Sequence, residues 1–194
     1  MSHRLFGTDG VRGKAGEYPL DHETVARLGG ALVRAMQRSN RQATPLRFVV
    51  GRDTRESGIW IERELARGVH SAGAEITSAG VIPTPAIAYV TRAMGFDAGL
   101  VISASHNPFE DNGIKVFSGR GEKFTEALER EVEAIVHDRG WSVEGSADVP
   151  VDRTNVVDPY VAHALLALPD PARLGRFAMA IDAPAIVVKP SSAA

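Results

Sequence analysis

Helical and extended sequence patterns alternate from about residue 20 onward, and this alternation constrains the fold more than any other feature of the chain. Alternating helices and strands build layered α/β domains, in which helices cover the faces of a sheet. The first helix is expected from about Asp21, a suitable N-cap residue. Apolar residues at the helical spacing that should form its buried face are Val25, Leu28, Leu32 and Met36. The arginines expected to remain in solvent are Arg27, Arg34 and Arg38.

The remaining elements follow in the same alternating order. Short apolar runs predict strands at residues 46–50, 74–79, 98–102 and 114–117. Helical spacing predicts one helix after Ser57, one from the Pro-Thr-Pro-Ala turn at 83–86, and one whose apolar stripe spans 124–135. The sequence therefore predicts a sheet with helices between its strands.

The character of the chain changes over residues 138–152, where Gly, Ser, Asp and Pro dominate and no periodicity persists. We place a first domain at 1–140, a linker at 141–157 and the start of a second domain at 158–194. That last part offers a helix near 160–168 and a strand at 177–181, too little to bury a core of its own. The chain is therefore expected to stop within its second domain.

Composition excludes several classes of function. Lys plus Arg total 22 against 24 for Asp plus Glu, so there is no basic excess to bind nucleic acid. The absence of cysteine removes disulfides, thiolate metal sites and thiol nucleophiles. No apolar run reaches the roughly 18 to 20 residues of a membrane-spanning helix, and no secretory signal follows the start. We expect a cytoplasmic protein without a membrane partner; its oligomeric state is unknown from sequence.

Side chains that can do chemistry concentrate in residues 99–119, where an apolar strand runs into a loop. Loops at the carboxyl ends of strands are where α/β folds bind ligands. Ser105 could exchange a phosphoryl group, His106 could shuttle a proton, and Lys115 could neutralise phosphate charge or carry a proton. The alternative is an ordinary polar turn, because Ser, Asn and Pro favour turns. A Ser–His hydrolase is less favoured, since the G-x-S-x-G elbow is missing.

Two further segments carry candidate binding residues. In GRDTRESG at 51–58, Arg52 and Arg55 flank Asp53 and offer guanidinium forks to phosphate or carboxylate oxygens. The alternative is a network in which these arginines and Asp53 satisfy one another, with Arg52 structural. In FGTDGVRG at 6–13, three glycines let the backbone approach a ligand, and Arg12 is a mobile cation.

Other sites are not supported by spacing. Glycine motifs for nucleotides are missing in detail. The histidines are scattered, and no set of carboxylates has the spacing of metal ligands, so the residues themselves predict no metal centre inside this chain.

Four segments in this order, FGTDGVRG, GRDTRESG, PTPA and SASHNPFEDNGIKVF, resemble the α-D-phosphohexomutase superfamily and, within it, the bacterial phosphoglucosamine mutases. The resemblance covers residues 4 to about 182. It implies an α/β fold with a layered mixed-sheet first domain of the phosphohexomutase type, followed by the start of a similar second domain. It also implies a cytoplasmic isomerase of amino-sugar metabolism that feeds peptidoglycan precursor synthesis.

The resemblance further implies that Ser105 is carried as a phosphoserine. This group would donate its phosphoryl group to glucosamine 6-phosphate, and the resulting 1,6-bisphosphate would turn around and return a phosphoryl group, leaving glucosamine 1-phosphate. Arg12 and Lys115 would be active-site cations, with Lys115 handling the proton, while His106 and Asn107 would be supporting polar groups. The implied cofactor is Mg2+, which only Ser105 contacts here, because the D-G-D-x-D-R loop of the family is not among the 194 residues.

Other departures from the family pattern favour a chain without turnover of its own. The sugar-recognition loop G-E-x-S-G and the C-terminal phosphate-binding segment are also missing, and Ala-Pro-Ala follows Asp182 where relatives have Asn-Gly-Ala. We expect a truncated, frame-shifted or incomplete product that is inactive alone. The alternatives are a non-catalytic domain I fragment that binds phosphate or sugar phosphate, and a phosphomannomutase or phosphoglucomutase.

Overall fold

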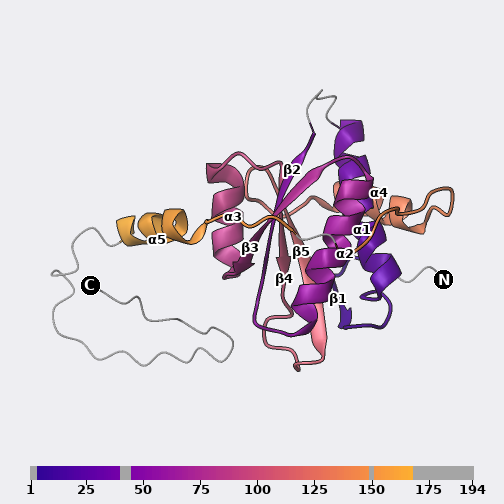
Figure 1. Ribbon diagram of the computed structural model, residues 1–194, viewed down its shortest axis with the longest axis horizontal. Helices are drawn as coiled ribbons and strands as arrows, with labels where there is room; N and C mark the ends of the chain where they lie inside the picture. The colour runs from indigo at the N-terminus through magenta and orange to yellow at the C-terminus, as the bar shows by residue number, and fades with distance from the viewer. Residues whose placement is uncertain (1–3, 40–44, 149–150, 168–194) are drawn as a thin grey trace.

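A single mixed sheet organises the computed structural model, which describes residues 4–39, 45–148 and 151–167 (Figure 1). The strands run in the order β1-β5-β4-β2-β3. Their bounds are β1 Val11–Lys14, β2 Arg47–Arg52, β3 Glu75–Val81, β4 Ala98–Ile102 and β5 Asp111–Ser118. Strand β2 is parallel to β3 and β4, whereas β5 is antiparallel to both β4 and β1. The predicted layered α/β fold with a mixed sheet is confirmed.

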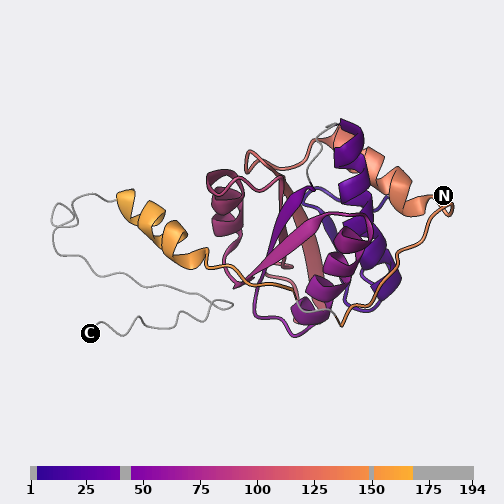
Figure 2. The same ribbon diagram turned by 45° about the horizontal axis from the view of Figure 1, so that its top comes forward.

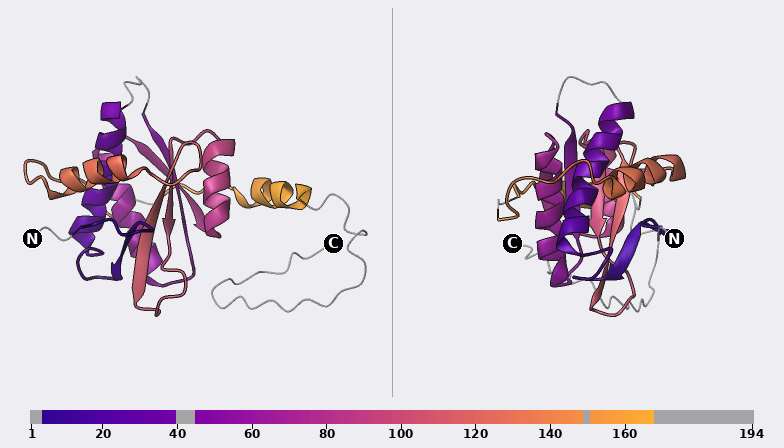
Figure 3. Two further views of the ribbon diagram at one scale, coloured as in Figure 1. Left: turned by 180° about the vertical axis from the view of Figure 1, so that it is seen from behind. Right: turned by 90° about the vertical axis from the view of Figure 1, so that its right-hand side faces the viewer.

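Helices cover both faces of this sheet. Their bounds are α1 His22–Ser39, α2 Ser57–Ser71, α3 Thr84–Ala93, α4 Glu126–His137 and α5 Val157–Leu166. Helices α1, α2 and α4 lie on one side and α3 on the other, a separation that the turned view makes clear (Figure 2). Helix α5 projects beyond α3, away from the sheet (Figure 3). Among the helices that the described residues form, none is long and apolar enough to cross a membrane.

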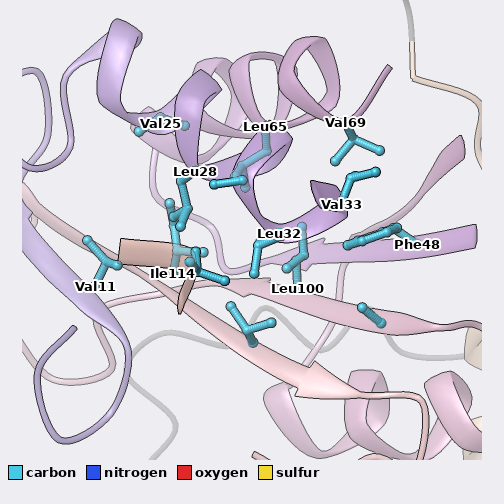
Figure 4. Close-up of a cluster of buried hydrophobic side chains, with 14 of the residues drawn as sticks. Val11, Val25, Leu28, Leu32, Val33, Phe48, Leu65, Val69, Leu100 and Ile114 are labelled. Carbon is cyan, nitrogen blue, oxygen red and sulfur yellow. The ribbon is translucent and has the colours of Figure 1, made fainter. Parts of the chain in front are cut away.

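The core is divided by the sheet because successive strand residues face opposite sides. The larger cluster lies between the sheet and α1, α2 and α4, where Leu28, Leu65 and Ile114 are buried together (Figure 4). The smaller cluster, which includes Ile87 and Val101, lies under α3. Strand β4 is buried at every position, as expected for a central strand covered on both faces.

The predicted elements are confirmed with shifted ends. Asp21 caps α1, since its Oδ1 accepts the Thr24 N–H at 2.9 Å. Strand β2 runs to Arg52 rather than residue 50, and β5 begins at Asp111 rather than residue 114. Strand β1 was not predicted. The predicted strand at 177–181, like most of 158–194, lies outside the described residues.

The prediction that Arg27 stays in solvent is wrong. Arg27 is only 6% exposed, and its guanidinium donates to the carbonyls of Val136, Asp138 and Trp141. These carbonyls lie at and just beyond the end of α4, so a charged donor replaces the missing next turn of the helix. Arg34 is half-buried, and Arg38 is exposed as predicted.

The segment predicted as a linker makes contacts with the sheet and with α1. The guanidinium groups of Arg27 and Arg34 both lie over the Trp141 ring, each with its Cζ 4.4 Å from the ring centroid. Further on, the Ser78 N–H donates to the Asp152 carbonyl at 2.7 Å and the Thr154 N–H to the Ser78 carbonyl at 3.0 Å. Trp141 is therefore anchored to the helical layer, and residues 152–154 are anchored to the sheet.

Candidate functional site

The loop that carries Ser105 joins β4 to β5 at the carboxyl end of β4. The hairpin is closed by the Ser103 N–H, which donates to the Gly113 carbonyl at 2.9 Å. Strand β2 is parallel to β4, with Arg52 opposite Ile102, so the loop after β2 starts at the same edge of the sheet. The Asp53 N–H donates to the Ile102 carbonyl at 3.0 Å and joins the two loops. This is the edge at which α/β sheets bind ligands.

Ser105 has a backbone conformation that L-residues avoid. Its φ is 58°, and it is the only non-glycine residue with a positive φ among those that the structure describes. This left-handed conformation costs roughly 1–2 kcal/mol for a residue with a Cβ. The Ser105 N–H donates to the Ser103 Oγ at 3.1 Å, and the Ser105 side chain is exposed to solvent. Such strain is retained where neighbouring groups hold the backbone in place.

Arg55 supplies much of that restraint. Its Nη2 donates to the carbonyls of Ser105 at 3.1 Å and Asn107 at 2.8 Å, and its Nη1 donates to the Pro108 carbonyl at 2.6 Å. Its Nε donates to the Asp53 Oδ2 at 3.2 Å. Four of its donors are thus used within the protein. Arg55 is therefore not the open fork for a ligand anion that the sequence suggested.

Asn107 and His106 have different surroundings. The Asn107 Nδ2 donates to the Asp111 Oδ2 at 2.9 Å, and the Asn107 N–H donates to the Ala104 carbonyl at 3.2 Å, so this residue shapes the turn. His106 is exposed and forms no hydrogen bond with any other residue in the described part of the chain. Its ring is therefore accessible to a ligand.

Arg12 and Lys115 are brought together by Asp9. The Asp9 Oδ2 lies 3.2 Å from the Arg12 Nη2 and 3.7 Å from the Lys115 Nζ. Arg12 on β1 is opposite Gly113 on β5, and Lys115 follows two residues later, so both occupy the face away from α1 and α2. Since an added Cβ at Gly113 would lie 3.2 Å from the Arg12 Cγ and 2.9 Å from the Ser103 carbonyl oxygen, the Arg12 side chain passes beside the start of the Ser105 loop.

The N-terminal segment completes this face of the sheet. Gly10 has φ of +101°, and an added Cβ would lie 2.2 Å from the Ile114 carbonyl oxygen, so only glycine allows this approach of β1 to β5. An open cleft beside the Asp9–Arg12 pair is lined partly by Arg4, Thr8 and Tyr18. The segment thus contributes cations and backbone to one concave region.

Arg52 has a structural partner. Its Nε lies 3.4 Å from the Oε2 of Glu62, and both side chains are mostly buried. Burial raises the pKa of Glu62, opposed by a hydrogen bond with Ser78 and by the charge of Arg52. The prediction that Arg52 is structural is consistent with this pairing.

The described residues do not form a metal centre by themselves. They contain no group of three His, Asp or Glu side chains placed to hold a metal ion. The carboxylates of Asp9, Asp53 and Asp111 are each engaged by a cation or an amide. Ser105 is the one metal contact predicted from the sequence, and that role stays a prediction.

Two contributions to the site were missed from the sequence. The sequence motifs indicate no role for Asp9, although its spacing of three residues from Arg12 is compatible with the ion pair that the structure shows. Arg55 and Asp53 were considered only as ligand-binding or mutually satisfied surface groups, and no local pattern indicates that Arg55 reaches carbonyls 50 to 53 residues away.

Comparison with known proteins agrees with this arrangement. A model of the family described as "Phosphoglucomutase/phosphomannomutase, alpha/beta/alpha domain I" matches residues 3–142. The phosphoglucosamine mutase of Koribacter versatilis is 55% identical over 133 residues, 69% of this chain and 28% of that protein. That of Deinococcus deserti is 50% identical over 137 residues, 70% and 30% of the two chains. The chain therefore spans less than a third of the length of these relatives.

Solved structures show the same fold. A structure described as a "putative phosphomannomutase" from Thermus thermophilus superposes with a TM-score of 0.71 at 26% identity, over 87% of this chain and 37% of that one. A phosphoglucomutase/phosphomannomutase family protein from Burkholderia thailandensis gives a TM-score of 0.65 at 24% identity, over 81% and 34%.

Proposed function

The chain belongs to the phosphoglucomutase/phosphomannomutase family, whose α/β/α domain I it carries at residues 3–142, and from this we propose that it is the phosphoserine-bearing domain of a phosphoglucosamine mutase. The family and fold class predicted from its motifs are confirmed. The observation that carries the proposal is the loop at the carboxyl end of β4, where Ser105 is held in a strained conformation beside the strand that presents Arg12.

In the proposed reaction, Ser105 carries a phosphoryl group between two half-reactions. An oxygen of glucosamine 6-phosphate attacks the phosphorus, the bond to the Ser105 Oγ breaks, and a 1,6-bisphosphate forms. After this intermediate turns around, the Ser105 Oγ attacks the phosphorus of its 6-phosphate, and the bond between that phosphorus and the sugar O6 breaks. Phosphoserine is restored, and glucosamine 1-phosphate leaves.

The neighbouring side chains have separate roles in this proposal. Lys115 takes the proton of the attacking hydroxyl and returns it to the departing oxygen. Arg12 offsets the charge of the phosphoryl oxygens, and Asp9 keeps the two cations side by side in the absence of phosphate. Asn107 shapes the loop, while the free ring of His106 contacts the substrate.

Mg2+ is the proposed cofactor of the whole protein. A phosphate on Ser105 would contribute an oxygen ligand, the kind this ion prefers. The described residues do not supply the rest of a metal site.

The proposal also covers organisation and setting. We place domain I at 1–140, its connection at 141–157 and the beginning of a second domain at 158–194, with the family match to residues 3–142 in support. The proposed setting is the cytoplasm, where the product would enter peptidoglycan precursor synthesis.

A hybrid enzyme tests this function. Residues 3–142 of this chain would replace the matching residues of the Koribacter versatilis relative, and conversion of glucosamine 6-phosphate would be measured with Mg2+ and a bisphosphate activator. We expect turnover in the hybrid, loss of turnover in its Ser105→Ala variant, and a phosphate on Ser105 by mass spectrometry. A hybrid that folds but neither turns over nor carries phosphate would contradict the proposal.

The same hybrid addresses the alternatives. Rates on glucosamine, glucose and mannose 6-phosphates would separate a phosphoglucosamine mutase from the phosphomannomutase named in the Thermus thermophilus structure. The alternative of a non-catalytic fragment is tested by assaying the 194-residue chain alone. We expect no turnover from this chain by itself.

A further inference from the structure

Arg55 is bonded to the residue proposed to carry phosphate and to two residues that follow it in the loop. Its planar guanidinium group donates hydrogen bonds to the carbonyls of Ser105, Asn107 and Pro108. Three carbonyls within four residues therefore converge on a single side chain. Such convergence fixes the curvature of the loop, because the guanidinium donors have a rigid fork geometry.

Arg55 is itself held in place by the sheet. Its Nε contacts the Asp53 Oδ2, and the Asp53 Oδ1 accepts the Arg55 N–H at 3.0 Å. Asp53 is in turn bonded through its N–H to the carbonyl of Ile102, the last residue of β4. The side chains of Arg55 and Asp53 are only 11% and 15% exposed. Arg55 and Asp53 thus connect the loop to β4, the strand from which the loop emerges.

The strain at Ser105 requires such a restraint. A left-handed serine relaxes unless surrounding contacts hold it. The Ser105 N–H and the Asn107 N–H bond to groups of residues 103 and 104, which belong to the same loop. Arg55 is the contact that ties the Ser105 carbonyl to a different loop, the one after β2.

We propose that Arg55 is a positioning residue that fixes the backbone of Ser105 for phosphoryl transfer, without itself binding the substrate. The inference rests on the proposed function of Ser105. Lysine cannot replace Arg55, since one ammonium group cannot reach three carbonyls and a carboxylate in a plane. Misplacement of a reacting group by about 1 Å costs on the order of a hundredfold in rate.

Variants of the hybrid enzyme test the proposal. We expect Arg55→Lys and Arg55→Ala to lower kcat by about a hundredfold with KM nearly unchanged. Added guanidinium ion should restore part of the kcat of Arg55→Ala and none of that of Arg55→Lys. The matched control is Arg63→Ala, an exposed arginine on α2 that should leave kcat and KM unchanged. An unchanged kcat in both Arg55 variants, or a loss confined to KM, would overturn the positioning role.

Hydrogen exchange in the 194-residue chain gives a test that does not depend on turnover. The amides of Ser105, Asn107 and Asp111 should exchange at least tenfold faster in Arg55→Lys, while those of β4 keep their protection. Faster exchange only throughout the chain would indicate general destabilisation and contradict the inference. An inactive wild-type hybrid with loosened amides confined to the loop would count against the proposed function but support the role of Arg55 in fixing the loop.

Discussion

Arg27 and Arg55 each bind three main-chain carbonyls of a segment that is distant in sequence. Arg27 does so within the helical layer, and Arg55 does so at an exposed loop. Arg27 closes the end of α4, and its acceptors lie against the helical layer and the Trp141 ring. Arg55 binds residues 105–108, all of which are exposed, and its charge is paired with Asp53.

The difference between these regions is in what the contacts achieve. Burial lowers the pKa of the Arg27 guanidinium, and the charge of Arg139 acts in the same direction. The charge of Arg27 is therefore unfavourable at this position, and its hydrogen bonds offset that cost. None of residues 136–141 has a positive φ, whereas Arg55 holds a loop that contains a strained serine. The same chemistry therefore stabilises the fold in one region and maintains a strained geometry in the other.

The largest effect on stability is expected from Arg27→Ala. The variant leaves the buried Val136 carbonyl without its donor, at a cost of about 1–3 kcal/mol, and also removes the donor of two part-buried carbonyls, so the free energy of unfolding should fall by about 3 kcal/mol. Urea unfolding of the 194-residue chain followed by circular dichroism would measure it. The control is Arg38→Ala on the same helix, an exposed site where about 0.5 kcal/mol or less is expected. Equal small losses in both variants would remove the contrast between the two regions.

A smaller loss is expected from Trp141→Ala. The variant removes a ring that contacts two guanidinium groups, and it removes the hydrogen bond from the Trp141 Nε1 to the Ile135 carbonyl at 2.8 Å. We expect a loss of about 2 kcal/mol, measured in the same way. Trp141→Phe, which keeps a flat ring but not the N–H, should fall between wild type and Trp141→Ala. No loss in either variant would show that this segment does not support α1.

Replacing Ser105 should change stability in the opposite direction. Ser105→Gly relieves the positive φ, and part of that gain is offset by the greater freedom of glycine in the unfolded chain. We expect Ser105→Gly to be about 0.5–1 kcal/mol more stable than Ser105→Ala, which keeps the strain. Thermal unfolding of the two variants would decide. A more stable Ser105→Ala would mean that the loop stores no strain.

The smallest effect concerns Arg52, an arginine paired with a carboxylate instead of carbonyls. Because burial raises the pKa of Glu62 above its ordinary 4.5, its contribution to stability is fully present below pH 4.5. This contribution is lost as the pH rises through the raised value. From about pH 4 to about pH 7, wild type should therefore lose stability relative to Glu62→Gln. Parallel unfolding profiles over this range would contradict the assignment.

Much of this fold was predictable from local pattern. The spacing of Leu28 and Leu32 placed α1, and the apolar run at 98–102 placed β4 with both ends correct. Strand β1 was missed because its four residues include two charges and a glycine and have no clear alternation. It is a strand because β5 offers it a free edge, with Val11 opposite Ile114.

Local sequence patterns identify the order of elements from α1 onward, the family, and Ser105, Arg12 and Lys115 as candidates, because these depend on periodicity and on motifs within a few residues. Tertiary structure decided which charges are structural. Arg27 and Arg55 find acceptors 50 to 114 residues away, and Asp9 links Arg12 on β1 to Lys115 on β5. A hydrogen-bond donor is satisfied by whichever acceptor the fold brings within about 3 Å, and no local pattern encodes that distance.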